Sequence, residues 1–194
     1  MIKRSALTYF LGFFTGAVVS AILLKIFPSI YQAFIGILAK KIQIQRQLIP
    51  NLPLMLITNN ILASLICAFG GYGISKVYLH RNANSSRLYY LTLYIFPIFI
   101  LFTSGFVLGA FFTPFIGDLA KFFNLLFPHG IFELPAVILS GSIGFDIGEG
   151  SIRSLYDIEV FRDDIDQIAK GKVGEYKAVI ALIVIGGLLE GVGL

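Results

Sequence analysis

The sequence predicts an all-α, polytopic membrane protein that forms a single integral membrane domain over residues 1–194, with about five transmembrane segments. Hydrophobic residues make up 57% of the chain and charged residues only 13%, whereas soluble domains average roughly a quarter charged residues. The apolar residues occur in long continuous runs, which is typical of membrane helices and excludes the alternating pattern of a membrane β-barrel. The polar residues gather in the stretches between these runs.

Five apolar runs are predicted to cross the bilayer, which needs roughly 20 residues of helix. They are residues 7–27, 54–76, 88–112, 132–147 and 178–194. The first run follows Lys3 and Arg4 and is too long for the core of a signal peptide, so we expect it to be kept as a span. The third contains Pro97, which predicts a kink. The fourth is short, so it either is kinked or forms a re-entrant pair with the segment before it.

Two further segments, residues 28–53 and 150–176, are predicted to be amphipathic helices. In the first, apolar residues recur at helical spacing among lysines and glutamines. This favours a helix lying at the membrane interface, with a polar linker helix as the alternative. In the second, apolar residues recur every three or four positions and form one seam. We expect this second helix to pack on the bundle as a connector rather than to serve as a dedicated docking helix.

The distribution of lysine and arginine predicts the orientation. With five spans, ten of the 15 Lys and Arg residues lie on the side of the N-terminus, and the remaining five lie on the other side. Because cytoplasmic loops carry an excess of these residues, the N-terminus is predicted to be cytoplasmic and the protein to lie in the cell membrane. A re-entrant fourth segment would invert the later half of this topology.

An intramembrane polar cluster is the candidate site. Its members are Asn59, Asn60, His129, Glu133 and Glu190. Under the five-span topology and the rise of an α-helix, these residues fall in the half of the membrane away from the N-terminus. Buried carboxylates and amides are stable in lipid only when they are paired or wetted, so we expect one polar cluster or one cavity. The alternatives are a helix cap for His129, interhelical hydrogen bonds for the Asn pair, and water contact for Glu190.

Prolines and glycines predict where helices bend and pack. Pro128, Gly130 and Pro135 indicate a turn or kink at the start of the fourth span. Pairs of the form Gly-x-x-x-Gly allow two membrane helices to approach closely. They are Gly12 with Gly16, Gly105 with Gly109, Gly144 with Gly148, and Gly187 with Gly191. These pairs predict either packing within one bundle or a homodimer.

No catalytic, metal or cofactor site is predicted. The two His residues and the single Cys cannot supply a four-ligand zinc site. His129 and Glu133 would give a metal only two ligands and lack the His-Glu-x-x-His pattern. Pairing Ser140 or Ser142 with a His lacks the third group of a catalytic triad. The net charge of +4 suits anionic lipid surfaces and does not indicate a nucleic-acid partner. Cys67 lies in an apolar run and is interpreted as a core residue.

The stretch PHGIFELPA, residues 128–136, resembles the signature of the stage II sporulation protein M family of integral membrane proteins. The segments TNNILASLICAFGG, SGFVLGA and LLEG are similar, in order and spacing, to the paired-Asn segment, the glycine segment and the Glu of the last span in that family. The resemblance covers roughly residues 58–191. It implies that Asn59, Asn60, His129, Gly130, Glu133, Pro135 and Glu190 occupy family positions. The chain departs from the family at Ser104, where an Asn is common.

The resemblance implies a function as well as a fold. Members of the family in spore-forming bacteria act with two partner proteins during engulfment. We therefore expect a non-enzymatic membrane scaffold that binds membrane or cell-envelope proteins, with a homodimer as one form of assembly. The alternative is a channel or transporter for an ion or small solute, because the polar cluster and the interrupted fourth segment are typical of transport sites.

Overall fold

The computed structural model describes residues 1–79, 86–127, 129–150 and 158–191. Within these ranges the regular elements are helices. They are α1 (Ile2–Ile26), α2 (Pro28–Leu48), α3 (Leu52–Leu79), α4 (Ser86–Phe112), the 3-10 turn η1 (Thr113–Phe115), α5 (Leu119–Leu126), α6 (His129–Gly150) and α7 (Ile158–Gly191). The prediction of an all-α chain is confirmed.

Four of the described helices, α1, α3, α4 and α6, are long and apolar enough to cross a membrane. Together with the composition, they confirm a multi-span helical membrane protein. Helix α7 has 34 residues, which corresponds to about 51 Å of helix. Its apolar part, residues 178–191, is short, has Glu175 and Lys177 just before it and contains Glu190. The amphipathic segment and the fifth span of the sequence prediction are thus two halves of one helix in the described region.

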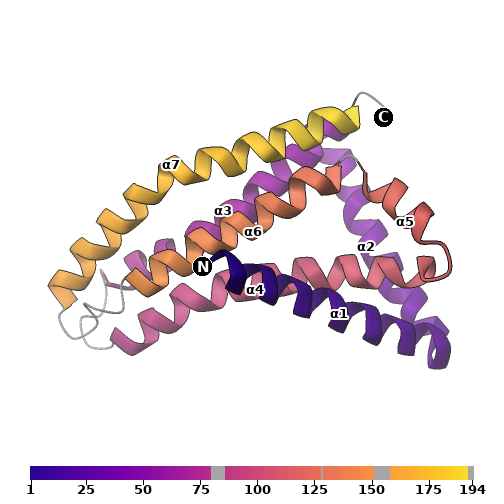
Figure 1. Ribbon diagram of the computed structural model, residues 1–194, viewed down its shortest axis with the longest axis horizontal. Coiled ribbons are helices and arrows are strands. Elements are labelled where there is room, and N and C mark those ends of the chain that lie inside the picture. The colour runs from indigo at the N-terminus through magenta and orange to yellow at the C-terminus, as the bar shows by residue number, and fades with distance from the viewer. Residues whose placement is uncertain (80–85, 128, 151–157, 192–194) are drawn as a thin grey trace.

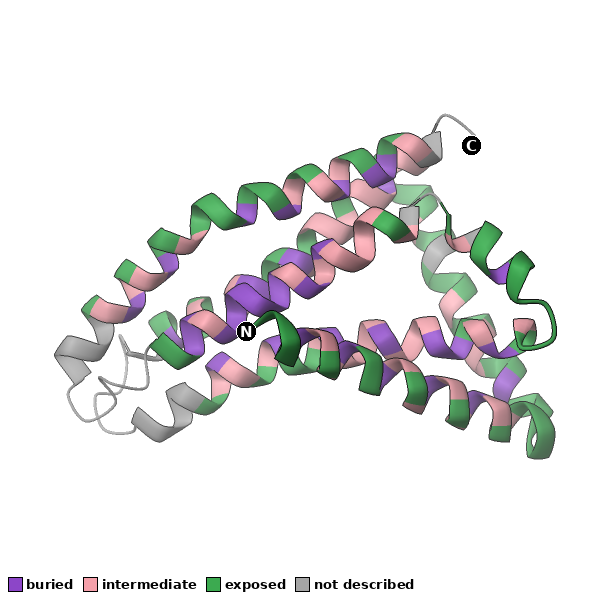
Figure 2. Ribbon diagram, in the orientation of Figure 1, coloured by how far each residue is buried: buried purple, intermediate pink, exposed green. Residues whose placement is uncertain are grey.

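The helices form two groups that meet at one end and diverge at the other (Figure 1). One group is the α1–α4 pair, and the other contains α3, α6 and α7, which pack on one another. Helix α2 runs from the end of α1 to the start of α3 across the diverging end, where α5 also lies (Figure 1). Helix α6 carries buried residues along much of its length, whereas α2 and α5 are mostly exposed (Figure 2).

Helix α6 contains the fourth predicted span. It is one helix from His129 to Gly150 with Pro135 inside it. Proline has no backbone N–H, so the carbonyl of Ile131 cannot receive its usual helical bond from that position. The helix continues regardless because its next three turns are packed on both groups through Ala136, Ile138, Ile143 and Phe145. The fourth predicted span is therefore a single continuous helix in the described region, and α5 precedes it as a separate short helix.

The predicted glycine pairs of α1 and α4 pack against each other. Gly12 and Gly16 on α1 face Gly105 and Gly109 on α4, and a Cβ on any of the four would overlap a backbone carbonyl oxygen of the facing helix. Such contact between backbones is possible only where side chains are absent. These pairs are consequently used inside the chain and are not available to a second copy.

Three predicted glycines of α6 and α7, namely Gly144, Gly148 and Gly187, also pack against neighbours in the same chain. A Cβ on Gly144 would lie 2.5 Å from the carbonyl oxygen of Cys67 on α3. A Cβ on Gly148 would lie 2.8 Å from the ring of Tyr94 on α4. A Cβ on Gly187 would overlap the side chain of Ile57 on α3. Of the two interpretations of the glycine pairs, packing within one bundle is the one observed at these positions.

Ion pairs attach the first half of α7 to the converging end of the bundle. The Lys76 ammonium of α3 lies 2.8 Å from a carboxylate oxygen of Asp166 on α7, and the Tyr72 hydroxyl donates a hydrogen bond of 2.8 Å to the same carboxylate. The Lys172 ammonium of α7 lies 2.8 Å from the carboxylate of Asp146 on α6. These contacts hold the polar half of α7 in line with its apolar half, which packs on α3 and α6.

The attachment at Asp166 is expected to be sensitive to acid. The hydrogen bond from Lys76, followed by that from Tyr72, lowers the pKa of Asp166 below its usual 3.8. A carboxylate with a lowered folded-state pKa contributes stability above its unfolded-state pKa, and this contribution is lost as the pH falls through the folded-state value. Relative to the intrinsic rate at the same pH, amide hydrogen exchange in the first half of α7 should therefore be faster below about pH 4.

The variant Asp166→Asn should show this faster exchange already at pH 7, while Asp163→Asn, at an exposed position of the same helix, should behave as the native chain does. Hydrogen exchange read by mass spectrometry measures both. Unchanged protection in Asp166→Asn at pH 7 would contradict the assignment.

Candidate functional site: an intramembrane polar cavity

A chain of side-chain amides ends on the carboxylate of Glu133. Gln45 of α2 donates through Nε2 to Oδ1 of Asn59 at 2.8 Å. Asn59 donates through Nδ2 to Oδ1 of Asn60 at 3.4 Å. Asn60 in turn donates through Nδ2 to Oε1 of Glu133 on α6. Three helices are thus joined by hydrogen bonds that all point in the same direction, towards the carboxylate.

The local sequence explains why two adjacent asparagines serve two neighbours. Consecutive residues of an α-helix are separated by about 100° around its axis. Asn59 and Asn60 of α3 therefore face different directions, and they meet Gln45 of α2 and Glu133 of α6 respectively.

The network borders a cavity of about 510 Å³ between the two groups of helices. This size falls within the range of about 300–1,000 Å³ that small-molecule sites occupy. The cavity is lined by five helices of the bundle and by α5. Its lining residues are Tyr9, Lys41, Asn59, Asn60, Ala63, Ile100, Thr103, Ser104, Val107, Leu108, Phe111, Leu126, Gly130, Glu133, Leu134 and Val137.

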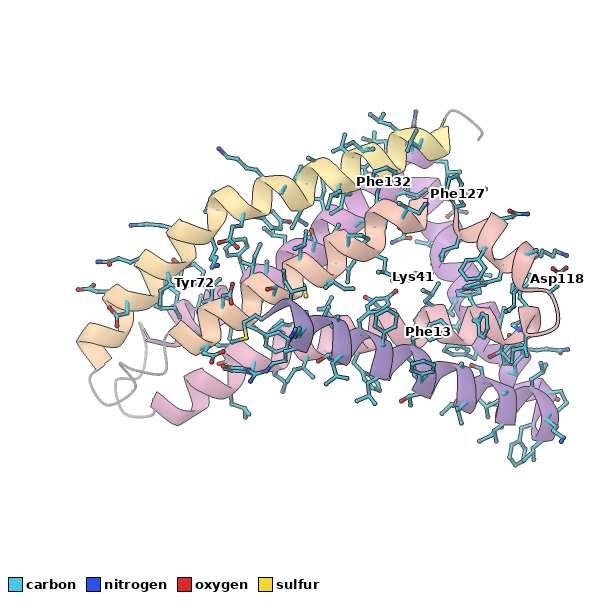
Figure 3. All side chains as sticks on the ribbon, viewed as in Figure 1. Phe13, Lys41, Tyr72, Asp118, Phe127 and Phe132 are labelled. Atoms are coloured by element: carbon cyan, nitrogen blue, oxygen red, sulfur yellow. The ribbon has the colours of Figure 1, made fainter. Side chains whose placement is uncertain are left out.

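Two of the lining residues carry formal charge. Glu133 comes from α6, and Lys41 comes from α2, which crosses the diverging end of the bundle. Lys41 is labelled in Figure 3 in the region between the α1–α4 pair and the α3–α6 pair. Most of the remaining wall is hydrocarbon. The cavity can thus bind polar or charged groups at Glu133 and Lys41 and apolar groups along most of the remaining wall.

The structure brings together three of the five predicted cluster residues. Asn59, Asn60 and Glu133 form one network and are half-buried, so they are both paired and open to the cavity. The backbone of His129 begins α6 and that of Glu190 lies in the last turn of α7. The side chains of these two residues and all of Pro128 lie outside the described structure.

Other predicted positions have packing roles around the cavity. Gly130 lines it, and a Cβ there would overlap the side chain of Leu126 on α5. Pro135 lies within α6. Ser104, the position that departs from the family pattern, lies on the cavity wall beside Thr103.

Sequence reasoning missed Lys41, Gln45 and Tyr9 as parts of the site. Lys41 and Gln45 are four residues apart and therefore share one face of α2, and this spacing was the only available signal. This spacing could not identify the site, because nothing in the sequence shows that α2 crosses the diverging end of the bundle. Tyr9 lies in an apolar run and is only 6% exposed.

The cavity holds no cluster of metal ligands among the described residues, where no three His, Cys, Asp or Glu side chains are grouped. A carboxylate, an ammonium, three amides and several hydroxyls can form hydrogen bonds and ion pairs with a guest.

Comparison with known proteins identifies the family. The sequence model of the stage II sporulation protein M family (SpoIIM) matches residues 5–193 of the 194-residue chain. Comparisons with curated proteins and with solved structures gave no match. The family match covers nearly all of the chain and confirms the resemblance carried by PHGIFELPA. The chain therefore belongs to the SpoIIM family of membrane proteins.

Proposed function

We propose that the chain is a non-enzymatic SpoIIM-like scaffold of the cell membrane, with a cytoplasmic N-terminus, which binds a helix of a partner membrane protein along the outward face of α7. The observation that carries the proposal is that this helix packs on the bundle with one face only. Ile165, Ala169, Tyr176, Val179 and Ile183 are buried in the core. The opposite face is exposed in the part of the chain that the structure describes.

The outward face of α7 is continuous. Many of its exposed positions recur at helical spacing, which places them in one stripe. They are Asp163, Gln167, Lys170, Gly171, Gly174, Ala178, Ala181, Ile185 and Leu188, and the exposed residues Val173, Glu175 and Lys177 flank them. The stripe changes from charged residues to small and then to large apolar ones. A partner helix that leaves the membrane at the same level would meet polar groups outside the bilayer and apolar groups inside it.

The glycines in the middle of this stripe have open space beside them. A Cβ on Gly171 or on Gly174 would meet no atom within 4 Å. Ala178 and Ala181 continue the same face. Small residues let membrane helices approach closely, and van der Waals contact of this kind is a main source of helix association in lipid. The glycines of the α1–α4 contact, by contrast, already pack against the backbone of the facing helix. This difference supports α7 as the helix that meets a partner.

The test is a photo-crosslinking amino acid at Ala181, used in native membranes. We expect a specific adduct that is lost when Gly174 and Ala178 are both replaced by leucine, because the larger side chains hold the partner helix away. The matched control is Gly73→Leu, which places leucine at an exposed glycine of α3 with open space around it. An adduct that persists in the double variant would contradict the proposal. An adduct between two copies of the chain would identify a homodimer as the assembly.

A second function, a channel or transporter for an ion or small solute, is favoured by the polar cavity. Glu133 lies near the start of the candidate span Gly130–Gly150, accepts a hydrogen bond from Asn60 of another helix and lines a cavity of ligand size. Ionisable residues in such positions mark solute and ion pathways. In liposomes, cation or proton flux should fall at least about tenfold in Glu133→Gln. It should be unchanged in Glu149→Gln, a carboxylate at the opposite end of α6. Equal flux with and without the protein would exclude this function.

A further inference from the structure

We propose that the cavity binds the zwitterionic headgroup of an aminophospholipid, with the ligand ammonium at Glu133 and the ligand phosphate at Lys41. This inference rests on the part of the second function that assigns a binding role to the cavity, and it names the chemical class of ligand that suits the two charges there. It follows from the charges of the cavity, from the direction of its hydrogen bonds and from the hydrocarbon surface next to it.

The cavity has one negative and one positive pole on different walls. Glu133 belongs to α6 and Lys41 to α2, and they are the only formally charged residues among those that line the described cavity. A simple cation would be attracted by Glu133 but repelled by Lys41. A simple anion would be attracted by Lys41 but repelled by Glu133. A ligand with no net charge and with separated ammonium and phosphate groups matches each pole with its opposite.

The negative pole is fixed by the amide chain. Gln45, Asn59 and Asn60 each donate towards Glu133, so their dipoles are aligned and the chain ends on the carboxylate. A carboxylate offers about four acceptor positions, so Glu133 can accept from Asn60 and from a ligand at the same time. A primary ammonium has N–H groups to donate, whereas a quaternary ammonium has none. The arrangement therefore favours ethanolamine over choline.

The surface beyond Lys41 points to a lipid rather than a free zwitterion. Lys41 also borders a second depression of about 320 Å³ on α2, whose surface is almost wholly hydrocarbon and whose other lining residues are Ile37, Lys40, Ile44 and Gln45. These isoleucines are 70% and 48% exposed. Lys41 thus lies where a polar cavity meets hydrocarbon surface, as the phosphate of a lipid lies between headgroup and acyl chains. Burial of acyl chain on this surface would add to the binding free energy.

The experiment uses the full-length protein in detergent micelles that contain equal amounts of phosphatidylethanolamine, phosphatidylcholine and phosphatidylglycerol. Native mass spectrometry reports which lipid is retained. We expect phosphatidylethanolamine to be retained at least about tenfold more than either competitor, since each loses one charge-assisted contact. Both Glu133→Gln and Lys41→Met should remove the preference. Glu149→Gln and Lys121→Met, which change exposed charges away from the cavity, should keep it.

Lys41→Met keeps the test decisive if Glu133→Gln fails to fold, because Lys41 lies on the exposed helix α2. Equal retention of the three lipids, or a native preference in either cavity variant, would overturn the proposal. Binding of free phosphoethanolamine without retention of the lipid would overturn the lipid as the source of the headgroup. Retention of phosphatidylethanolamine by a protein that gives no flux in liposomes would support the ligand and reject transport.

Discussion

Gly105→Leu is expected to destabilise the protein by about 3 kcal/mol or more, because it forces α1 and α4 apart. A Cβ at Gly105 would overlap the carbonyl oxygen of Tyr9 and lie 2.9 Å from the backbone nitrogen of Phe13. Both obstacles are backbone atoms of a regular helix, so neither can turn aside as a side chain can. The cost therefore includes the loss of contact along the rest of this interface as well as the local overlap.

Thermal unfolding in detergent, together with the yield of monodisperse protein, measures this effect. The control is Gly73→Leu, since a Cβ at Gly73 meets no atom within 4 Å. It should unfold close to the native temperature. Gly105→Ala should lie between the two, because the first carbon already collides and the remaining carbons add to it. Equal unfolding temperatures for Gly105→Leu and Gly73→Leu would show that the close helix contact does not stabilise the fold.

The glycine contact also connects stability to the site. Tyr9, whose carbonyl meets Gly105, lines the cavity, as do Ser104 and Thr103 beside Gly105 on α4. The α1–α4 pair supplies one wall of the cavity, and α3 with α6 supplies the opposite wall. The distance between α1 and α4 therefore helps to set the shape of the wall. Variants that separate the pair should alter ligand binding even where some folded protein remains.

The glycine pairs illustrate what sequence can predict about packing. Their spacing correctly indicated close helix contact, because only a residue without a side chain allows it. It did not indicate the partner. A Gly-x-x-x-Gly face can pack against another span of the same chain or against a second copy of the chain. Which of the two it contacts depends on how all the helices fill the space around it. Gly171 and Gly174, which are not in that pattern, are the glycines of α7 left open.

Helix α7 shows why the boundary of an element is harder to predict than its existence. The composition changes near residue 177, from charged to apolar, and the sequence was divided there into an amphipathic segment and a span. Backbone hydrogen bonds do not depend on that change, and no proline interrupts them, so the helix continues from Ile158 to Gly191. The ion pairs of Lys172 and Asp166 hold its polar half against the bundle.

The candidate site was predicted in part because the bilayer limits what polar residues can do. Amides and carboxylates at similar depth in different spans must find partners or water, and Asn60 and Glu133 are partners in the structure. The roles of His129 and Glu190 remain predictions. Lys41 and Gln45 could not be placed, because a helix that lies at an interface and a helix that covers a cavity have the same amphipathic pattern.

The pair Asn60 and Glu133 should show energetic coupling in a double-mutant cycle. Asn60→Leu leaves the carboxylate without the amide that α3 supplies, and Glu133→Leu leaves that amide without its acceptor. Hydrogen bonds to charged groups contribute about 1.5–3 kcal/mol, and an unsatisfied partner loses more than the bond itself. Each single variant should therefore be destabilised by about 2 kcal/mol. The double variant should be more stable than the sum of the two losses predicts, because neither unsatisfied group remains.

Equilibrium unfolding of the four proteins in detergent gives the coupling free energy, which we expect to be about 1.5 kcal/mol or more. The control cycle combines Asn60→Leu with Glu149→Leu. Glu149 lies at the other end of α6, and its carboxylate pairs with Arg4 of α1. Residues that share no partner should give additive losses. Additive losses for Asn60 and Glu133 as well would mean that water in the cavity satisfies each group separately. The amide chain would then position the carboxylate for a guest without stabilising the fold.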